Sequence, residues 1–180
     1  MRNPLQIIDD LVMSGVNSGV SAWNYTTGRT KADLAQILMY SGPVGFFSAT
    51  YFNPIYMITG VISIHVAVKF SKLSKLTQKL EESASNKDMK NRLVEGTKPL
   101  YQIGGYGMQV MAPVHLSLIN DETNLVENQL AALSFFSMGV ASHVMRAEYM
   151  PPRKDCIRRG IDKLAEMFKR DSQEPAIGIN

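Results

Sequence analysis

The chain has 180 residues, which is enough for about one domain with a buried core. Charged residues make up 19% of the sequence, against about 25% in an average soluble domain. The net charge is only +3 and both signs are mixed along the chain, which argues against a nucleic-acid partner. The single cysteine, Cys156, excludes an internal disulfide.

The first residues predict an amphipathic helix. Asn3 is a typical helix cap, and Pro4 suits the first helical position. Asp9 and Asp10 are then expected near the positive end of the helix dipole. Acidic residues at this point also argue against a cleaved signal peptide. The apolar stripe of this helix consists of Leu5, Ile8, Val12 and Val16.

The basic residues are distributed unevenly. All nineteen Lys and Arg lie in three blocks, at positions 2–31, 69–98 and 146–170. The two windows between these blocks contain none. Two helical hairpins with their basic flanks on one side of a bilayer would produce this pattern, because Lys and Arg concentrate on the cytoplasmic side. We therefore expect the termini and the central linker to be cytoplasmic. The expected far-side turns are residues 51–54 and 120–127.

The charge-poor windows hold four apolar segments, and most of them are short for a membrane span. A bilayer core needs about 20 apolar residues in a helix. Gly42-Pro43 interrupts the first segment and Gly104-Gly105 interrupts the third. Short, interrupted segments fit short spans, re-entrant hairpins or the buried core of a soluble protein. The four segments are residues 34–52, 54–68, 99–119 and 128–145.

The second apolar segment predicts one long helix, from residue 54 to about residue 82. Asn53 followed by Pro54 is typical of a helix start, and neither Pro nor Gly occurs between Gly60 and the end of the helix. After Val68 the segment becomes amphipathic, with lysines beside an apolar stripe. The stripe consists of Val66, Phe70, Leu73, Thr77 and Leu80.

Polar segments follow each hairpin. Residues 83–98 are polar and predict a linker, which divides the chain into residues 1–82 and 99–180. After Pro151-Pro152 we expect a basic, amphipathic C-terminal helix. Its apolar positions are Ile157, Ile161, Leu164 and Phe168.

The sequence carries few signals of chemistry. No phosphate-binding loop, zinc-protease motif or paired-cysteine motif occurs, so we assign no catalytic residue and no metal site. His65, His115 and His143 each fall in a different charge-poor segment. Imidazoles that face one another between helices are common ligands of haem or metal. A cofactor site shared by these three histidines is one hypothesis, and histidines hydrogen-bonded within the fold are the other.

These observations favour an all-α protein with two hydrophobic helical hairpins, membrane-spanning or re-entrant, and amphipathic helices at both ends. The expected function is a non-enzymatic, membrane-associated structural or accessory subunit of a larger assembly. Its expected partners are other subunits or further copies of the chain, together with the lipid bilayer. A haem- or quinone-binding membrane anchor is the first alternative. A soluble helical protein buried in an oligomer or virion-like shell is the second, because protein can also cover short apolar segments.

Overall fold

The computed structural model describes residues 3–82, 87–119, 124–151, 159–160 and 163. Within these residues the chain forms five helices and no strand, which confirms the all-α prediction. The helices are α1 (Pro4–Thr27), α2 (Lys31–Ala49), α3 (Tyr56–Glu82), α4 (Lys87–Ser117) and α5 (Leu125–Arg146).

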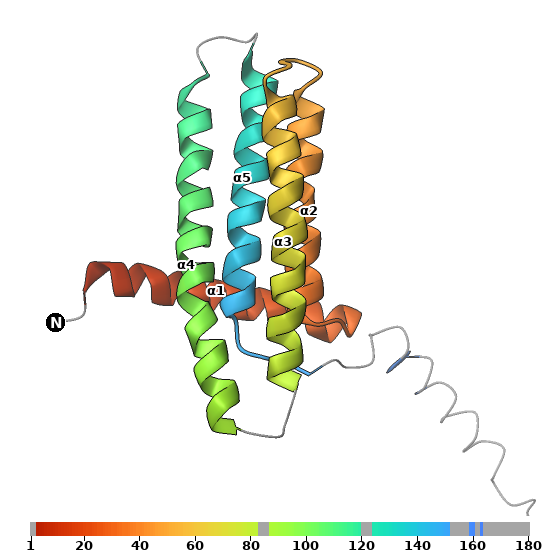
Figure 1. The fold of residues 1–180 in the computed structure, drawn as a ribbon, viewed down its shortest axis with the longest axis vertical. Coiled ribbons are helices and arrows are strands. Elements are labelled where there is room, and N and C mark those ends of the chain that lie inside the picture. The colour runs from red at the N-terminus through yellow and green to blue at the C-terminus, as the bar shows by residue number, and fades with distance from the viewer. Residues whose placement is uncertain (1–2, 83–86, 120–123, 152–158, 161–162, 164–180) are drawn as a thin grey trace, which may run out of the picture.

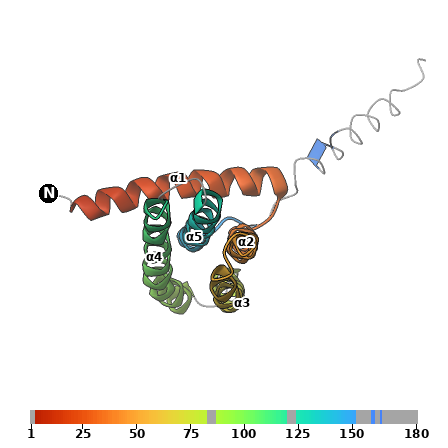
Figure 2. The same cartoon turned by 90° about the horizontal axis from the view of Figure 1, so that it is seen from above.

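Helices α2 to α5 stand side by side as a bundle, and α1 runs across one side of it (Figure 1). Figure 2 shows that α5 lies between α2 and α4, and that α3 packs against α2 on the side away from α1. The α2–α3 turn, the end of α4 and the start of α5 lie together, and we call this the turn end of the bundle. The opposite end, where α2 begins and where α3 and α5 finish, is the basal end.

Helix α1 begins as the sequence predicts. The side-chain oxygen of Asn3 accepts a hydrogen bond from the backbone of Leu5 at 3.1 Å, and Gln6 accepts one from the backbone of Asn3 at 3.3 Å. The helix ends at Gly28, whose φ of 72° is readily adopted only by glycine. The expected dipole role of the acidic pair is wrong, because the first turn contains no acidic residue and Asp9 lies further along the helix.

Glycines let α5 approach both of its neighbours closely. A Cβ atom on Gly42 of α2 would lie 2.5 Å from Cγ of Met138, and one on Gly105 of α4 would lie 2.6 Å from Nε2 of His143. Both helices continue through these glycines, where the sequence predicts interrupted segments. The reason is that small residues at a helix contact allow close packing without breaking the helix.

Helix α3 is continuous to Glu82, as predicted, although it begins at Tyr56 because the two preceding residues belong to the turn. Among the described residues it is the one helix that is long and apolar enough to cross a membrane, and only 28% of its most apolar window is buried. The other three bundle helices have a higher proportion of Gly, Ser and Gln. Of the four apolar segments that the sequence offers as membrane spans, length and composition therefore support one, the segment in α3.

The predicted linker is helical from Lys87 onward, because residues 87–98 form the beginning of α4. Lys, Met, Arg, Leu and Glu are good helix formers, so a polar segment of this composition favours a solvated helix over a loop. Glu95 and Lys98 add an exposed ion pair of 2.6 Å. The predicted C-terminal helix and the turn at residues 120–123 lie outside the described residues, apart from Arg159, Gly160 and Lys163.

Candidate functional site

A cluster of polar side chains fastens α1 to α4 and α5. Both terminal nitrogens of the Arg146 guanidinium donate to the carboxylate of Asp9, with Nη1–Oδ1 at 2.8 Å and Nη2–Oδ2 at 2.6 Å. The hydroxyl of Tyr106 donates to the same carboxylate at 2.7 Å. Asp9 thus receives three hydrogen bonds from two other helices, and we call these residues, with His143 and Gln109, the α1 clasp.

His143 lies at the centre of the α1 clasp and is fully buried. Its Nδ1 is 3.2 Å from Nη1 of Arg146, and its Nε2 is 3.3 Å from the side-chain oxygen of Gln109. Arginine has only donors, so Nδ1 accepts and Nε2 carries the proton that is donated to Gln109. The ring of Tyr106 packs edge-on against the imidazole at 4.8 Å. Both ring nitrogens of His143 are therefore engaged within the protein.

The charges of the α1 clasp stabilise each other. The hydrogen bonds from Arg146 lower the pKa of Asp9 below its ordinary value of 3.8, although burial acts in the opposite direction. The same contact raises the pKa of Arg146, so both side chains remain charged. A bidentate pair of this geometry holds its two helices in a defined orientation. The α1 clasp therefore positions α1 on the bundle. Its hydrogen-bond donors and acceptors are paired with each other within the cluster.

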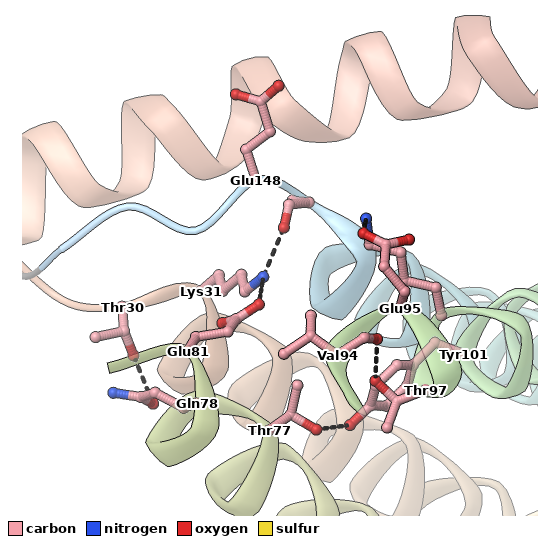
Figure 3. Close-up of polar contacts among 12 residues, drawn as sticks. Thr30, Lys31, Thr77, Gln78, Glu81, Val94, Glu95, Thr97, Tyr101 and Glu148 are labelled. Atoms are coloured by element: carbon pink, nitrogen blue, oxygen red, sulfur yellow. Dashed lines mark hydrogen bonds and ion pairs between the residues drawn. The ribbon is translucent and has the colours of Figure 1, made fainter. Parts of the chain in front are cut away.

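A second polar cluster closes the basal end and is drawn in Figure 3. Lys31 and Glu81 are buried, with exposed fractions of 3% and 5%, and form an ion pair of 2.7 Å. The Lys31 ammonium also donates to the backbone oxygen of Ala147 at 2.6 Å. Burial lowers the pKa of Lys31 below its ordinary value, and Glu81 opposes this shift. The cluster ties α2, α3 and the end of α5 together at one point.

Two hydroxyl contacts extend this basal cluster toward its neighbours. The Thr30 hydroxyl lies 3.2 Å from the side-chain oxygen of Gln78, and the hydroxyls of Thr77 and Tyr101 are 3.1 Å apart (Figure 3). The ring of Tyr101 also packs edge-on against Phe70 at 5.7 Å. Through Tyr101, α4 contacts α3 at the basal end, so the cluster joins all four bundle helices.

The three predicted histidines lie in different environments. His65 is exposed on α3, whereas His143 is buried in the α1 clasp. His115 is half-buried on α4, with Nδ1 3.0 Å from the backbone oxygen of Met111 and its ring near Tyr56 and Phe135. In the described part of the chain, no group of three or more His, Cys, Asp or Glu is placed to hold a metal ion. The shared cofactor site stays a prediction, and ligation by His143 would require it to leave Arg146 or Gln109.

The bundle has an unusual distribution of polarity toward its turn end. Large apolar side chains there are exposed, while several buried side chains are polar, among them Ser63, Asn128 and Ser134. These three polar side chains are hydrogen-bonded, as in the 3.0 Å contact from the Tyr56 hydroxyl to Asn128. We call the exposed apolar surface the apolar belt. Its members include Tyr40, Val44, Ile58, Val61, Ile62, Val114, Leu133 and Phe136.

Helix α1 has one apolar and one polar side. Gly19 and Trp23 line an apolar groove of about 480 Å³ that continues onto α2 and α5, where Leu38 and Val140 lie toward the turn end. On its other side, the Asn17 oxygen accepts a hydrogen bond at 3.1 Å from the backbone of Glu148, beyond the end of α5. The apolar side of α1 therefore faces the same direction as the apolar belt.

Sequence reasoning missed the α1 clasp and the buried Lys31–Glu81 pair. One signal for the α1 clasp was present, because Asp9 follows Leu5 by four residues and precedes Val12 by three, on the apolar stripe of the first helix. A carboxylate on an apolar stripe needs a partner when it is buried. Its partner, Arg146, is 137 residues away in sequence, so local patterns did not identify it.

Comparison with protein-family models, with curated proteins and with solved structures finds no match for this chain.

Proposed function

We propose that the protein is a non-enzymatic, membrane-embedded structural or accessory subunit, with the apolar belt in the lipid bilayer and the α2–α3 turn on its far side. The observation that carries this proposal is the apolar belt, whose large side chains are exposed at the turn end although the interior there also holds polar side chains such as Ser63 and Asn128. A soluble monomer rarely exposes such a large apolar surface. Lipid removes the penalty of that exposure, and small residues at the helix contacts are typical of membrane bundles.

The charge-free length of the bundle helices agrees with this proposal. On α5, Glu127 and Arg146 are 19 residues apart with no charged residue between them. At 1.5 Å per residue this corresponds to about 28 Å, close to a hydrocarbon core of about 30 Å. The charge-free part of α3 is shorter, and Lys69 on it can extend its ammonium toward the headgroups. Glycine, serine and proline weaken the hydropathy of the other helices, as expected for helices that contact each other.

The orientation of α1 also supports a membrane location. An interfacial helix buries its apolar side in the boundary between headgroups and acyl chains and keeps its polar side in water. The apolar side of α1 faces the direction of the apolar belt, and Asn17 lies on the opposite side. In this proposal the basal end, with the lysines of α3, faces the cytoplasm, since basic residues concentrate there. Partner subunits or further copies then complete the assembly.

The proposal is tested by membrane extraction and by cysteine accessibility. Cys156 is first replaced by Ser, and a single cysteine is introduced by Tyr51→Cys at the turn end or by Lys79→Cys near the basal end. Tyr51 is 88% exposed and Lys79 is also exposed, so neither change disturbs the core. We expect the protein to resist carbonate extraction. In intact cells an impermeant maleimide should label the Tyr51→Cys variant, and the Lys79→Cys variant only after permeabilisation.

Release of the protein by carbonate, with equal reactivity of both cysteines, would contradict the proposal and favour the soluble, assembly-buried alternative. The haem-binding alternative has its own readout, which is the absorption spectrum and metal content of the purified protein. A Soret band that disappears in a His143→Ala variant would support that alternative. If the purified protein shows neither a Soret band nor stoichiometric metal, the haem-binding alternative is contradicted and His143 has a structural role.

A further inference from the structure

We propose that a groove on the outer face of α2 binds one anionic phospholipid from the leaflet on which α1 lies. This inference rests on the membrane location proposed above. The groove has a volume of about 590 Å³ and begins at the corner between α1 and α2. Arg29 lies at the corner, and Ile37, Tyr40 and Val44 line the groove toward the turn end. The groove thus joins a cationic end to an apolar body, which is the complement of an anionic amphiphile.

The positive charge of Arg29 is available to a ligand. Its side chain is exposed, and in the described part of the chain it forms no ion pair. The backbone at this position is held by the Asn24 side chain, which donates to the Arg29 carbonyl oxygen at 3.0 Å. A guanidinium binds a phosphate through paired N–H donors, so one phosphate group matches Arg29 in both charge and geometry.

The groove is also lined by one carboxylate, that of Asp33, which would repel a phosphate. Its hydrogen bonds hold it at the start of α2. Oδ2 of Asp33 accepts hydrogen bonds from the backbone nitrogen of Thr30 at 3.0 Å and from its hydroxyl at 2.8 Å. The bond from the Thr30 backbone is one half of the capping box at the start of α2, and the other half runs from the Asp33 backbone nitrogen to the Thr30 hydroxyl oxygen at 3.3 Å. The carboxylate of Asp33 is therefore held at the start of α2 by Thr30, and the phosphate site is built around Arg29.

The apolar part of the groove has the depth of one leaflet. Ile37, Tyr40 and Val44 follow each other at intervals of three and four residues, so they share one face of α2. Val44 is 66% exposed, and the other two are also exposed. From Lys31 to Val44 the helix rises about 20 Å, which matches half of a bilayer of about 40 Å measured with its headgroups. A phosphate at Arg29 thus allows an acyl chain to follow α2 to the bilayer midplane.

The inference is tested by native mass spectrometry of the full chain, purified in a neutral detergent and titrated with phosphatidylglycerol or phosphatidylcholine. We expect one phosphatidylglycerol to bind more tightly than phosphatidylcholine. Arg29→Gln should weaken phosphatidylglycerol binding by about fivefold, since one basic residue near anionic lipid contributes about this factor. Phosphatidylcholine binding should stay unchanged in that variant, and Arg29→Lys should restore part of the difference. Lys79→Gln, which also removes one exposed cation, is the matched control and should bind like the wild type.

Three results would overturn the inference. The first is unchanged phosphatidylglycerol binding in Arg29→Gln, and the second is an equal loss in Lys79→Gln, which means diffuse attraction to the whole basic surface. The third is full competition by glycerol phosphate, because the site then recognises free phosphate and the apolar groove plays no part. Carbonate extraction of the wild type is measured separately. A protein that stays in the membrane but shows any of these results contradicts the lipid site alone, whereas release by carbonate contradicts the proposed function.

Discussion

Arg146 and Asp9 form a bidentate ion pair that joins the last described turn of the bundle to the first helix of the chain, with contacts of 2.8 and 2.6 Å. The side chain of Arg146 is 9% exposed and that of Asp9 is 22% exposed. The pair is therefore mostly shielded from water, and the orientation of α1 across the bundle depends on it. Tyr106 completes the contact from α4, so three helices meet at one carboxylate.

Replacing Asp9 by Asn should loosen α1. The change leaves the partly buried guanidinium of Arg146 without its counter-charge, and we expect a loss of about 2 to 3 kcal/mol in the free energy of unfolding. The measurement is chemical or thermal unfolding of the detergent-purified protein. The control is Glu95→Gln, which removes an exposed ion pair with Lys98 and should cost less than about 1 kcal/mol. Equal effects of the two changes would show that the Asp9 contact is not special.

The same carboxylate predicts a dependence of stability on pH. The pKa of Asp9 is lowered in the folded protein by the Arg146 hydrogen bonds, relative to the ordinary value of 3.8 expected in the unfolded chain. The stabilisation is therefore complete above the ordinary pKa and is lost as the pH falls through the folded pKa. Unfolding of the wild type measured between neutral and strongly acidic pH should show this loss. The Asp9→Asn variant should show a smaller loss over the same range, and parallel curves would contradict the prediction.

Replacing Gly105 by Ala should destabilise the contact between α4 and α5. A Cβ at this position would lie 2.6 Å from Nε2 of His143 and 2.8 Å from its Cε1, so the buried imidazole has to move. Overpacking of this kind costs about 1 to 3 kcal/mol. Gly107, two residues along the same helix, provides the control because nothing lies within 4 Å of its added Cβ. Gly107→Ala should stabilise α4 by up to about 1 kcal/mol, and the two melting temperatures should move in opposite directions.

The buried pair at the basal end predicts a rescue by a second change. Lys31→Met leaves the buried carboxylate of Glu81 without its ammonium partner and should cost about 3 to 5 kcal/mol. The double variant Lys31→Met with Glu81→Leu removes both charges and should recover much of that loss. A double-mutant cycle of unfolding free energies measures the coupling. Additive losses in the double variant would mean that the two side chains act independently.

Local sequence determined the helices of this protein. The Asn3–Pro4 start and the amphipathic pattern beyond Val68 are signals that act within about one turn, and both predicted their helices closely. The same reasoning predicted two hairpins from the positions of the Lys and Arg blocks. It predicted a polar linker at residues 83–98, of which residues 87–98 form the beginning of α4, because a polar composition suits a helix as well as a loop.

Only the tertiary structure decided what the chemically distinctive residues do. His65, His115 and His143 look alike as isolated histidines in apolar segments, yet one is exposed, one packs against two aromatic rings and one is buried beside Arg146. The crossing of α1 over the bundle places Asp9 against Arg146. That contact depends on how helices pack across more than a hundred residues of chain, whereas periodicity and caps report only on neighbours along one helix. Local sequence therefore predicts most of the helical segments, and packing determines which side chains meet.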